Sequence, residues 1–128
     1  METTESIRFL VQGSASELYE VTFIRMGKEL TAFCTCQDGQ NRLHCKHRVS
    51  ILKGSQKNIV SDNVSDVAKV QSWLPGSSIQ QALRHVKICE ARVKAANWEF
   101  SDAKRKLAEV MNDTIKYDHD TDVIIIKE

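Results

Sequence analysis

The sequence is poor in aromatic residues, in proline and in long apolar runs. Aromatic residues make up 6% of its 128 positions, and Pro75 is its single proline. It has no run of eighteen apolar residues, so no segment is expected to cross a membrane. Residues 1–12 open with acidic and polar side chains, and their apolar stretch is too short for a signal peptide. We therefore expect a cytoplasmic protein.

Excess charge and catalytic motifs are missing as well. The formal net charge is +1, so the charge of the whole molecule does not predict a nucleic-acid partner. The sequence has no Ser/His/Asp set, no carboxylate pair and no glycine-rich phosphate loop, and we expect no enzymatic activity. Its 128 residues suffice for one domain or for a small domain with an appendage, and its 41% hydrophobic content is typical of a soluble globular protein.

Three of the four cysteines lie close together, at Cys34, Cys36 and Cys45, and His47 follows. In a reducing compartment, clustered cysteines are more often metal ligands than disulfides. Cys34 and Cys36 are two residues apart at the end of an expected strand, so they project to one face. Cys45 and His47 can reach a common point if Cys45 precedes a helix that contains His47. Three thiolates and an imidazole predict one structural Zn²⁺ per chain, with no open position for substrate.

Other cysteine and histidine residues are weaker candidates. His44 is an alternative fourth ligand, although it would place two ligands at adjacent positions, 44 and 45. Cys89 is expected to be a small hydrophobic residue in the middle of a helix. His85 and His119 are isolated and are expected on the surface.

The hydrophobic pattern predicts strands followed by helices. Alternating and β-branched residues predict strands at 7–12, 18–25 and 30–36, with turns at Gly27 and at residues 38–41. A short helix is expected from Lys46 to Gly54, another at 63–74, and a strand at 123–127. This last strand is expected to join the N-terminal sheet or the sheet of a partner.

A long helix is expected at residues 78–112, after the break at Pro75-Gly76. Ser78 and Gln81 fit a capping box at its start. Its heptad positions a and d are all apolar or small, which predicts a coiled-coil seam in a homodimer. The seam comprises Ile79, Ala82, Val86, Cys89, Val93, Ala96, Phe100, Ala103, Leu107 and Val110. The alternative is a break near Ser101-Asp102 that folds two shorter helices on each other.

The cysteine cluster also resembles a known family. The pattern Cys34-x-Cys36, eight residues, then Cys45-x-His47 is similar to the SWIM-type zinc finger. The flanking segments LYEVTFI and HRVSIL resemble the strand and helix of that family, so the likeness covers about residues 18–54. It implies a ββα unit that binds DNA or protein, and it does not decide between them.

These observations predict an α+β fold with four parts. Residues 1–58 form a SWIM-like zinc module on an N-terminal antiparallel sheet, and residues 59–76 form a short helix and connector. Residues 77–113 form the dimerisation helix, and residues 114–128 form a loop and a C-terminal strand.

Two functions remain open from the sequence. The first is a protein-interaction adaptor that dimerises through its long helix, and it is slightly favoured. The second is a DNA-binding regulator that uses Arg42, Lys46, Arg48 and Lys53 of the finger. Arg42, Lys46 and Arg48 would also stabilise a zinc site that carries a formal charge of −1, and that explanation needs no nucleic acid.

Overall fold

We describe a computed structural model of the chain, which covers residues 3–113, 115–118, 120–121 and 123–126. Its contacts divide the chain into two compact units, residues 1–84 and residues 85–128. Each unit is described by itself.

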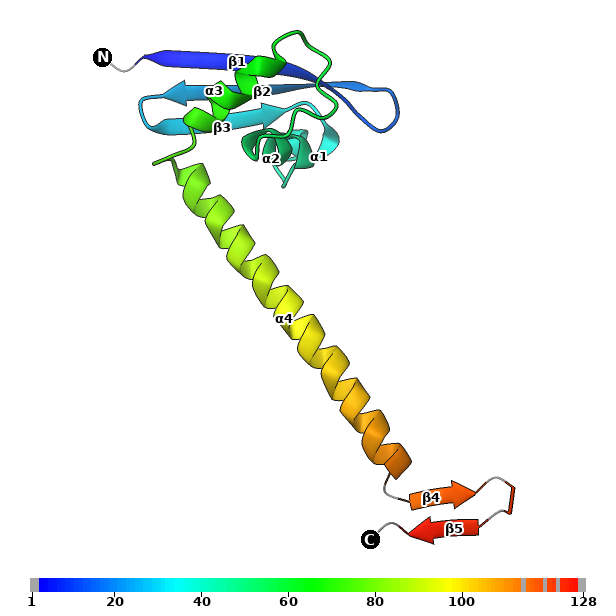
Figure 1. The fold of residues 1–128 in the computed structure, drawn as a ribbon. Helices are drawn as coiled ribbons and strands as arrows, with labels where there is room; N and C mark the ends of the chain where they lie inside the picture. Colours follow the sequence, from blue (N-terminus) through cyan, green and yellow to red (C-terminus); the bar gives the residue numbers. More distant parts are fainter. Residues whose placement is uncertain (1–2, 114, 119, 122, 127–128) are drawn as a thin grey trace. The chain divides into compact units, whose positions relative to one another are not determined.

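The first unit contains a three-stranded antiparallel sheet in the order β1-β2-β3 (Figure 1). The strands are β1 (Thr4–Gln12), β2 (Leu18–Met26) and β3 (Glu29–Cys34). Alternate residues of each strand face the core because side chains on a strand point to opposite faces in turn. Phe9 pairs with Val21, and Val21 pairs with Cys34, so the first cysteine of the cluster lies on the buried face.

Two short helices supply the other side of the core. They are α2 (Lys46–Leu52) and α3 (Val67–Ser72), and the 3₁₀ turn η1 (Val64–Asp66) leads into α3. Ile51 and Leu52 of α2 are buried with Val67 and Val70 of α3 and the adjacent Trp73. The sequence predicted a short helix and connector at residues 59–76. In the structure this segment contains η1 and α3 and lies within the first unit, where the apolar face of α3 contributes to the core.

The polar segment before η1, residues 58–63, is also part of the fold. It runs beside β1, where the Gln12 amide donates to the Asn58 carbonyl and the Val60 amide donates to the Leu10 carbonyl, both at 2.8 Å. The Asn63 side chain donates to the Arg8 carbonyl at 2.9 Å. These bonds satisfy backbone groups along the outer edge of β1, which would otherwise be open to pairing with another chain.

A single continuous helix, α4 (Ser78–Asp113), follows (Figure 1). The continuous helix predicted from the sequence is confirmed, and the alternative break near Ser101-Asp102 does not occur. Asp102 forms ion pairs with Arg105 at 2.7 Å and Lys106 at 3.0 Å along the helix. The capping box is shifted by one residue from the prediction. The Ser77 hydroxyl accepts from the Gln80 amide, and the Gln80 side chain accepts from the Gly76 amide. Within the described residues, no helix is both long and apolar enough to cross a membrane.

The chain beyond α4 forms a hairpin of β4 (Ile115–Asp118) and β5 (Val123–Ile126). The sequence predicted a loop and one strand in residues 114–128, but residues 115–118 of this segment form the additional strand β4. Strand β5 pairs with β4 and makes no part of the N-terminal sheet. The nearest available partner for a short apolar strand is the segment just before it, because closing a short loop costs little entropy.

Candidate metal centre

Four side chains from three local elements converge at one end of the first unit. Cys34 is the last residue of β3, and Cys36 is the N-cap of the single-turn helix α1 (Gln37–Gln40). Cys45 is the N-cap of α2, and His47 lies in the first turn of that helix. Their ligand atoms all lie within 4.8 Å of one another. The sequence predicted these four residues but expected a simple turn at residues 38–41, where α1 is found.

The distances among the ligand atoms fit one tetrahedral ion. His47 Nδ1 lies 3.7 Å from Cys34 Sγ and 3.6 Å from Cys45 Sγ, and Cys36 Sγ lies 3.4 Å from Cys45 Sγ. Zn–S bonds of about 2.3 Å and Zn–N bonds of about 2.0 Å at tetrahedral angles place neighbouring ligands about 3.5–3.8 Å apart. The donor set and its spacing therefore suit Zn²⁺.

The family comparison agrees with this geometry. Residues 9–53 match the SWIM zinc finger. No curated protein and no solved structure matches the chain. The resemblance noted in the sequence is confirmed, and the match extends further toward the N-terminus than residues 18–54, because it takes in β1 from Phe9. The four Cys and His residues of this SWIM finger are arranged to bind one zinc ion.

Backbone amides support the sulfur ligands of the SWIM finger. The Gly39 amide donates to Cys36 Sγ at 3.3 Å, and the Cys36 amide donates to Cys34 Sγ at 3.5 Å. Such bonds orient metal ligands and stabilise their charge. A Cβ atom on Gly39 would overlap the carbonyl oxygen of Cys34, so this turn requires glycine for steric reasons.

Tyr19 supports the histidine ligand. Its ring lies 5.2 Å from the ring of His47 with a tilt of 40°, and its hydroxyl donates to the Glu17 carboxylate at 2.6 Å. We did not predict this role from the sequence. The alternation in β2 places Tyr19 on the same face as Val21, which pairs with Cys34. This alternation was the sequence signal that could have placed Tyr19 near the zinc ligands.

Arg48 holds the finger together and does not extend freely into solvent. Its guanidinium donates to the Ala32 carbonyl of β3 at 3.1 Å and to the Leu43 carbonyl of the ligand loop at 2.5 Å. Its two terminal nitrogens, Nη1 and Nη2, thus join α2 to its neighbours. The sequence predicted Arg48 as a contact for nucleic acid or a partner, and this stays a prediction. Arg42, Lys46 and Lys53 are exposed.

The ligand environment shifts proton affinities in different directions. Burial raises the pKa of the Cys34 thiol to about 12. The pKa of Cys45 is lowered. Burial alone would raise this pKa, but the hydrogen bonds that its sulfur accepts, led by the one from the Arg48 amide, have the larger combined effect. Burial, and then the charge of Lys46, lower the pKa of His47, which favours the neutral imidazole that binds zinc. Zinc binds the thiolate form of cysteine, so zinc binding must displace a proton from the Cys34 thiol.

The weaker candidates lie outside the zinc site. His44 is exposed and is not in the ligand cluster. Cys89 is partly exposed on α4, where its sulfur lies 3.7 Å from Nε2 of the exposed His85. The prediction for His119 falls outside the described residues.

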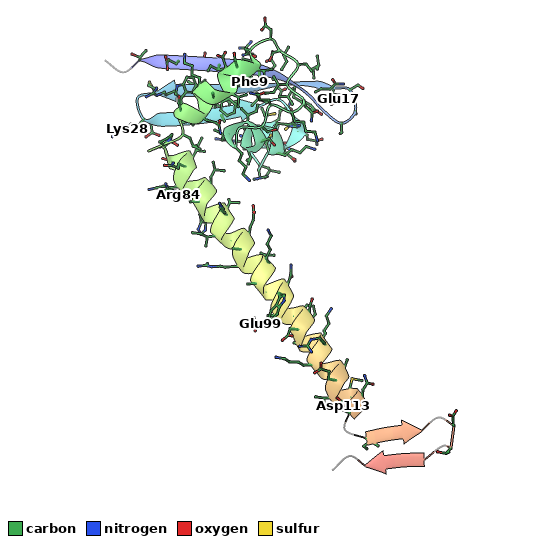
Figure 2. All side chains as sticks on the ribbon, in the orientation of Figure 1. Phe9, Glu17, Lys28, Arg84, Glu99 and Asp113 are labelled. Atoms are coloured by element: carbon green, nitrogen blue, oxygen red, sulfur yellow. The ribbon has the colours of Figure 1, made fainter. Side chains whose placement is uncertain are left out.

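The predicted seam residues all lie on α4, whose side chains extend along its length from Arg84 past Glu99 to Asp113 (Figure 2). Ile79 differs from the others because it packs partly against the core of the first unit, as Leu83 does. The exposed stripe of large seam residues, Val86, Val93, Phe100 and Leu107, begins after this first turn of the helix.

Proposed function

We propose that the protein is a non-enzymatic adaptor. Its SWIM finger serves as a rigid head that binds a protein partner, and α4 joins two copies into a homodimer. A structural rather than a catalytic zinc ion is supported by the four protein ligands, since a closed tetrahedral shell leaves no position for water or substrate.

One observation carries the dimer: the apolar stripe on α4 is exposed. Val86, Val93, Phe100 and Leu107 follow one another at seven-residue spacing, and their exposed fractions are 42%, 58%, 63% and 59%. Burying one such side chain contributes about 1.5–3 kcal/mol. Four of them on one face of a 36-residue helix favour pairing with a second helix. An identical chain supplies that helix by twofold symmetry, the commonest arrangement of soluble oligomers.

Light scattering with zinc quantitation on the same sample tests this proposal. We expect a molar mass twice the chain mass of 14.5 kDa and one zinc ion per chain. A mass of one chain across the micromolar range would reject the homodimer. A zinc content near zero in a folded sample would reject the structural role of the metal.

DNA binding is the second candidate, and a basic cavity favours it. A cavity of about 460 Å³ lies between the end of β1 and α2 in the first unit. Lys46 and Lys57 line it together with Ser50 and Ser55, and its lining contains no Asp or Glu. Exposed lysines and hydroxyl groups are the usual donors to phosphate oxygens.

Replacing Lys46, Lys53 and Lys57 together with Gln tests this candidate. If the lysines bind phosphates, affinity for random duplex DNA should fall and the slope of log affinity against log salt should become shallower, by about one unit per lost contact. The control is a triple Gln variant at Lys28, Lys87 and Lys94, which removes the same charge elsewhere. Equal loss in both variants would indicate only bulk charge, and no binding by the wild-type protein at low salt would exclude this candidate.

A further inference from the structure

We infer that the two copies of α4 pair antiparallel, with Val93 of each chain opposite Ala96 of the other. The inference rests on the homodimer proposed above and assigns its direction and register. Two independent features of α4 carry it, namely the sizes of the seam residues and the charges beside them.

The seam residues differ in size in a regular way. From Val86 onward, position a is large at Val86, Val93, Phe100 and Leu107. Position d is small at Ala82, Cys89, Ala96 and Ala103. In a parallel pair each residue would meet its own copy, so Phe100 would face Phe100 while the next layer would place Ala103 against Ala103. Layers of such different width leave voids between straight helices, and voids cost stability.

An antiparallel pair removes this mismatch because position a of one helix then faces position d of the other. Each of the four inner kinds of layer joins a large residue to a small one, which is the arrangement that fills a core evenly, and only the end layer of Ile79 and Val110 does not. The layers pair Val93 with Ala96, Val86 with Ala103, Phe100 with Cys89 and Leu107 with Ala82, each formed twice by symmetry. Small residues along the seam also let the two backbones approach closely.

The flanking charges select this register. In an antiparallel pair, position g lies near position g of the partner, and position e lies near position e. With Val93 opposite Ala96, Arg92 at position g meets the partner's Glu99, and this favourable pair forms twice. At position e, Glu90 meets the partner's Asn97, so no two acidic groups face each other.

Sliding the helices by one heptad in either direction brings like charges to face each other at these flanking positions. One shift places Arg92 against the partner's Arg92 and Glu90 against the partner's Glu90. The other places Glu99 against the partner's Glu99 once and Arg92 against the partner's Lys106 twice, and these three unfavourable contacts outnumber the two favourable ones between Glu90 and the partner's Lys104. Facing like charges destabilise a helix pair, so each shifted register carries a penalty that the proposed one lacks.

The direction of pairing decides how far apart the two SWIM fingers of the dimer lie. The overlap from Ala82 to Leu107 spans about 38 Å at 1.5 Å per residue. An antiparallel pair places the two SWIM fingers at opposite ends of this overlap, whereas a parallel pair would place them together. The dimer is therefore suited to bridge two separated binding sites on one partner or on two.

Engineered disulfides test the direction and the register in the zinc-loaded full chain. The background variant is Cys89→Ser, which leaves only cysteines that are zinc ligands. In that background we expect the double variant Val86→Cys/Ala103→Cys to form a species of twice the chain mass in a glutathione redox buffer. Each single variant, Val86→Cys or Ala103→Cys, should remain mostly uncrosslinked, because its copies lie far apart. The unmodified background controls for links through zinc ligands.

Each outcome has a distinct meaning. Links in the double variant alone, mapped by mass spectrometry to positions 86 and 103, support the inference. Links in both single variants would show a parallel dimer and overturn it. A protein that is dimeric by light scattering but forms no link in any variant would overturn the register. A monomeric mass would instead reject the homodimer, so failure of the proposed function is seen separately.

Discussion

Replacing Cys36 with serine is expected to unfold the first unit while the helical signal of α4 persists. Cys36 donates its sulfur to the zinc site and also caps α1, where it accepts from the Gly39 amide. Structural zinc supplies about 10–16 kcal/mol of apparent folding free energy in zinc-finger peptides, which equals or exceeds the total stability of most small domains. The loss of one ligand should therefore remove zinc and leave the sheet unfolded.

The two tryptophans allow this result to be measured by fluorescence. Trp73 is buried in the core of the first unit with 4% of its surface exposed, whereas Trp98 on α4 is 71% exposed. In a Trp98→Phe background, the emission of Trp73 should shift to longer wavelength in Cys36→Ser, and also when a chelator is added to the parent protein. Circular dichroism should retain the helical signal of α4, because none of its residues is a zinc ligand.

Cys89→Ser is the matched control for this experiment. It makes the same chemical change at a cysteine outside the zinc site, so zinc content and Trp73 emission should match the parent protein. If Trp73 stays buried in the zinc-free Cys36→Ser protein, the apolar core alone holds the unit together and the structural role of zinc is refuted.

The zinc ligands and the main elements could be predicted because their signals are local. The spacing of Cys34, Cys36, Cys45 and His47 specifies a tetrahedral donor set, and alternation within a few residues specifies each strand. The continuous α4 followed from a periodicity sustained over five heptads. Each of these signals lies within a stretch of neighbouring residues.

Contacts between distant segments could not be predicted in the same way. Val67, Val70 and Trp73 show an apolar helical face, but nothing in their spacing says that the face covers the N-terminal sheet. Arg48 looks the same in sequence as the exposed Lys46 and Lys53, although its guanidinium is bound to two carbonyl groups. Side-chain hydrogen bonds across the fold depend on tertiary positions, and the residue type alone does not reveal them.

The seam itself is tested most strongly by Val93→Asp. In the proposed dimer, Val93 lies near the twofold axis, so the variant would bury two unpaired carboxylates close together. A buried charge without a partner costs several kcal/mol. A loss of about 3 kcal/mol in dimer stability already corresponds to a more than 100-fold increase in the dimer Kd. Light scattering should therefore show a monomer at concentrations where the wild-type protein is a dimer.

The matched control is Ala91→Asp, which adds the same charge two residues earlier on the same helix. Ala91 occupies position f, which points away from the seam, and it is exposed in the structure. This variant should remain dimeric, and its zinc content and that of Val93→Asp should equal the wild-type value, because the SWIM finger is unchanged in both. An unaltered mass and melting temperature for Val93→Asp would show that α4 does not pair through this face. A monomer for both variants would show that added charge anywhere on α4 prevents association, and the seam would lose its support.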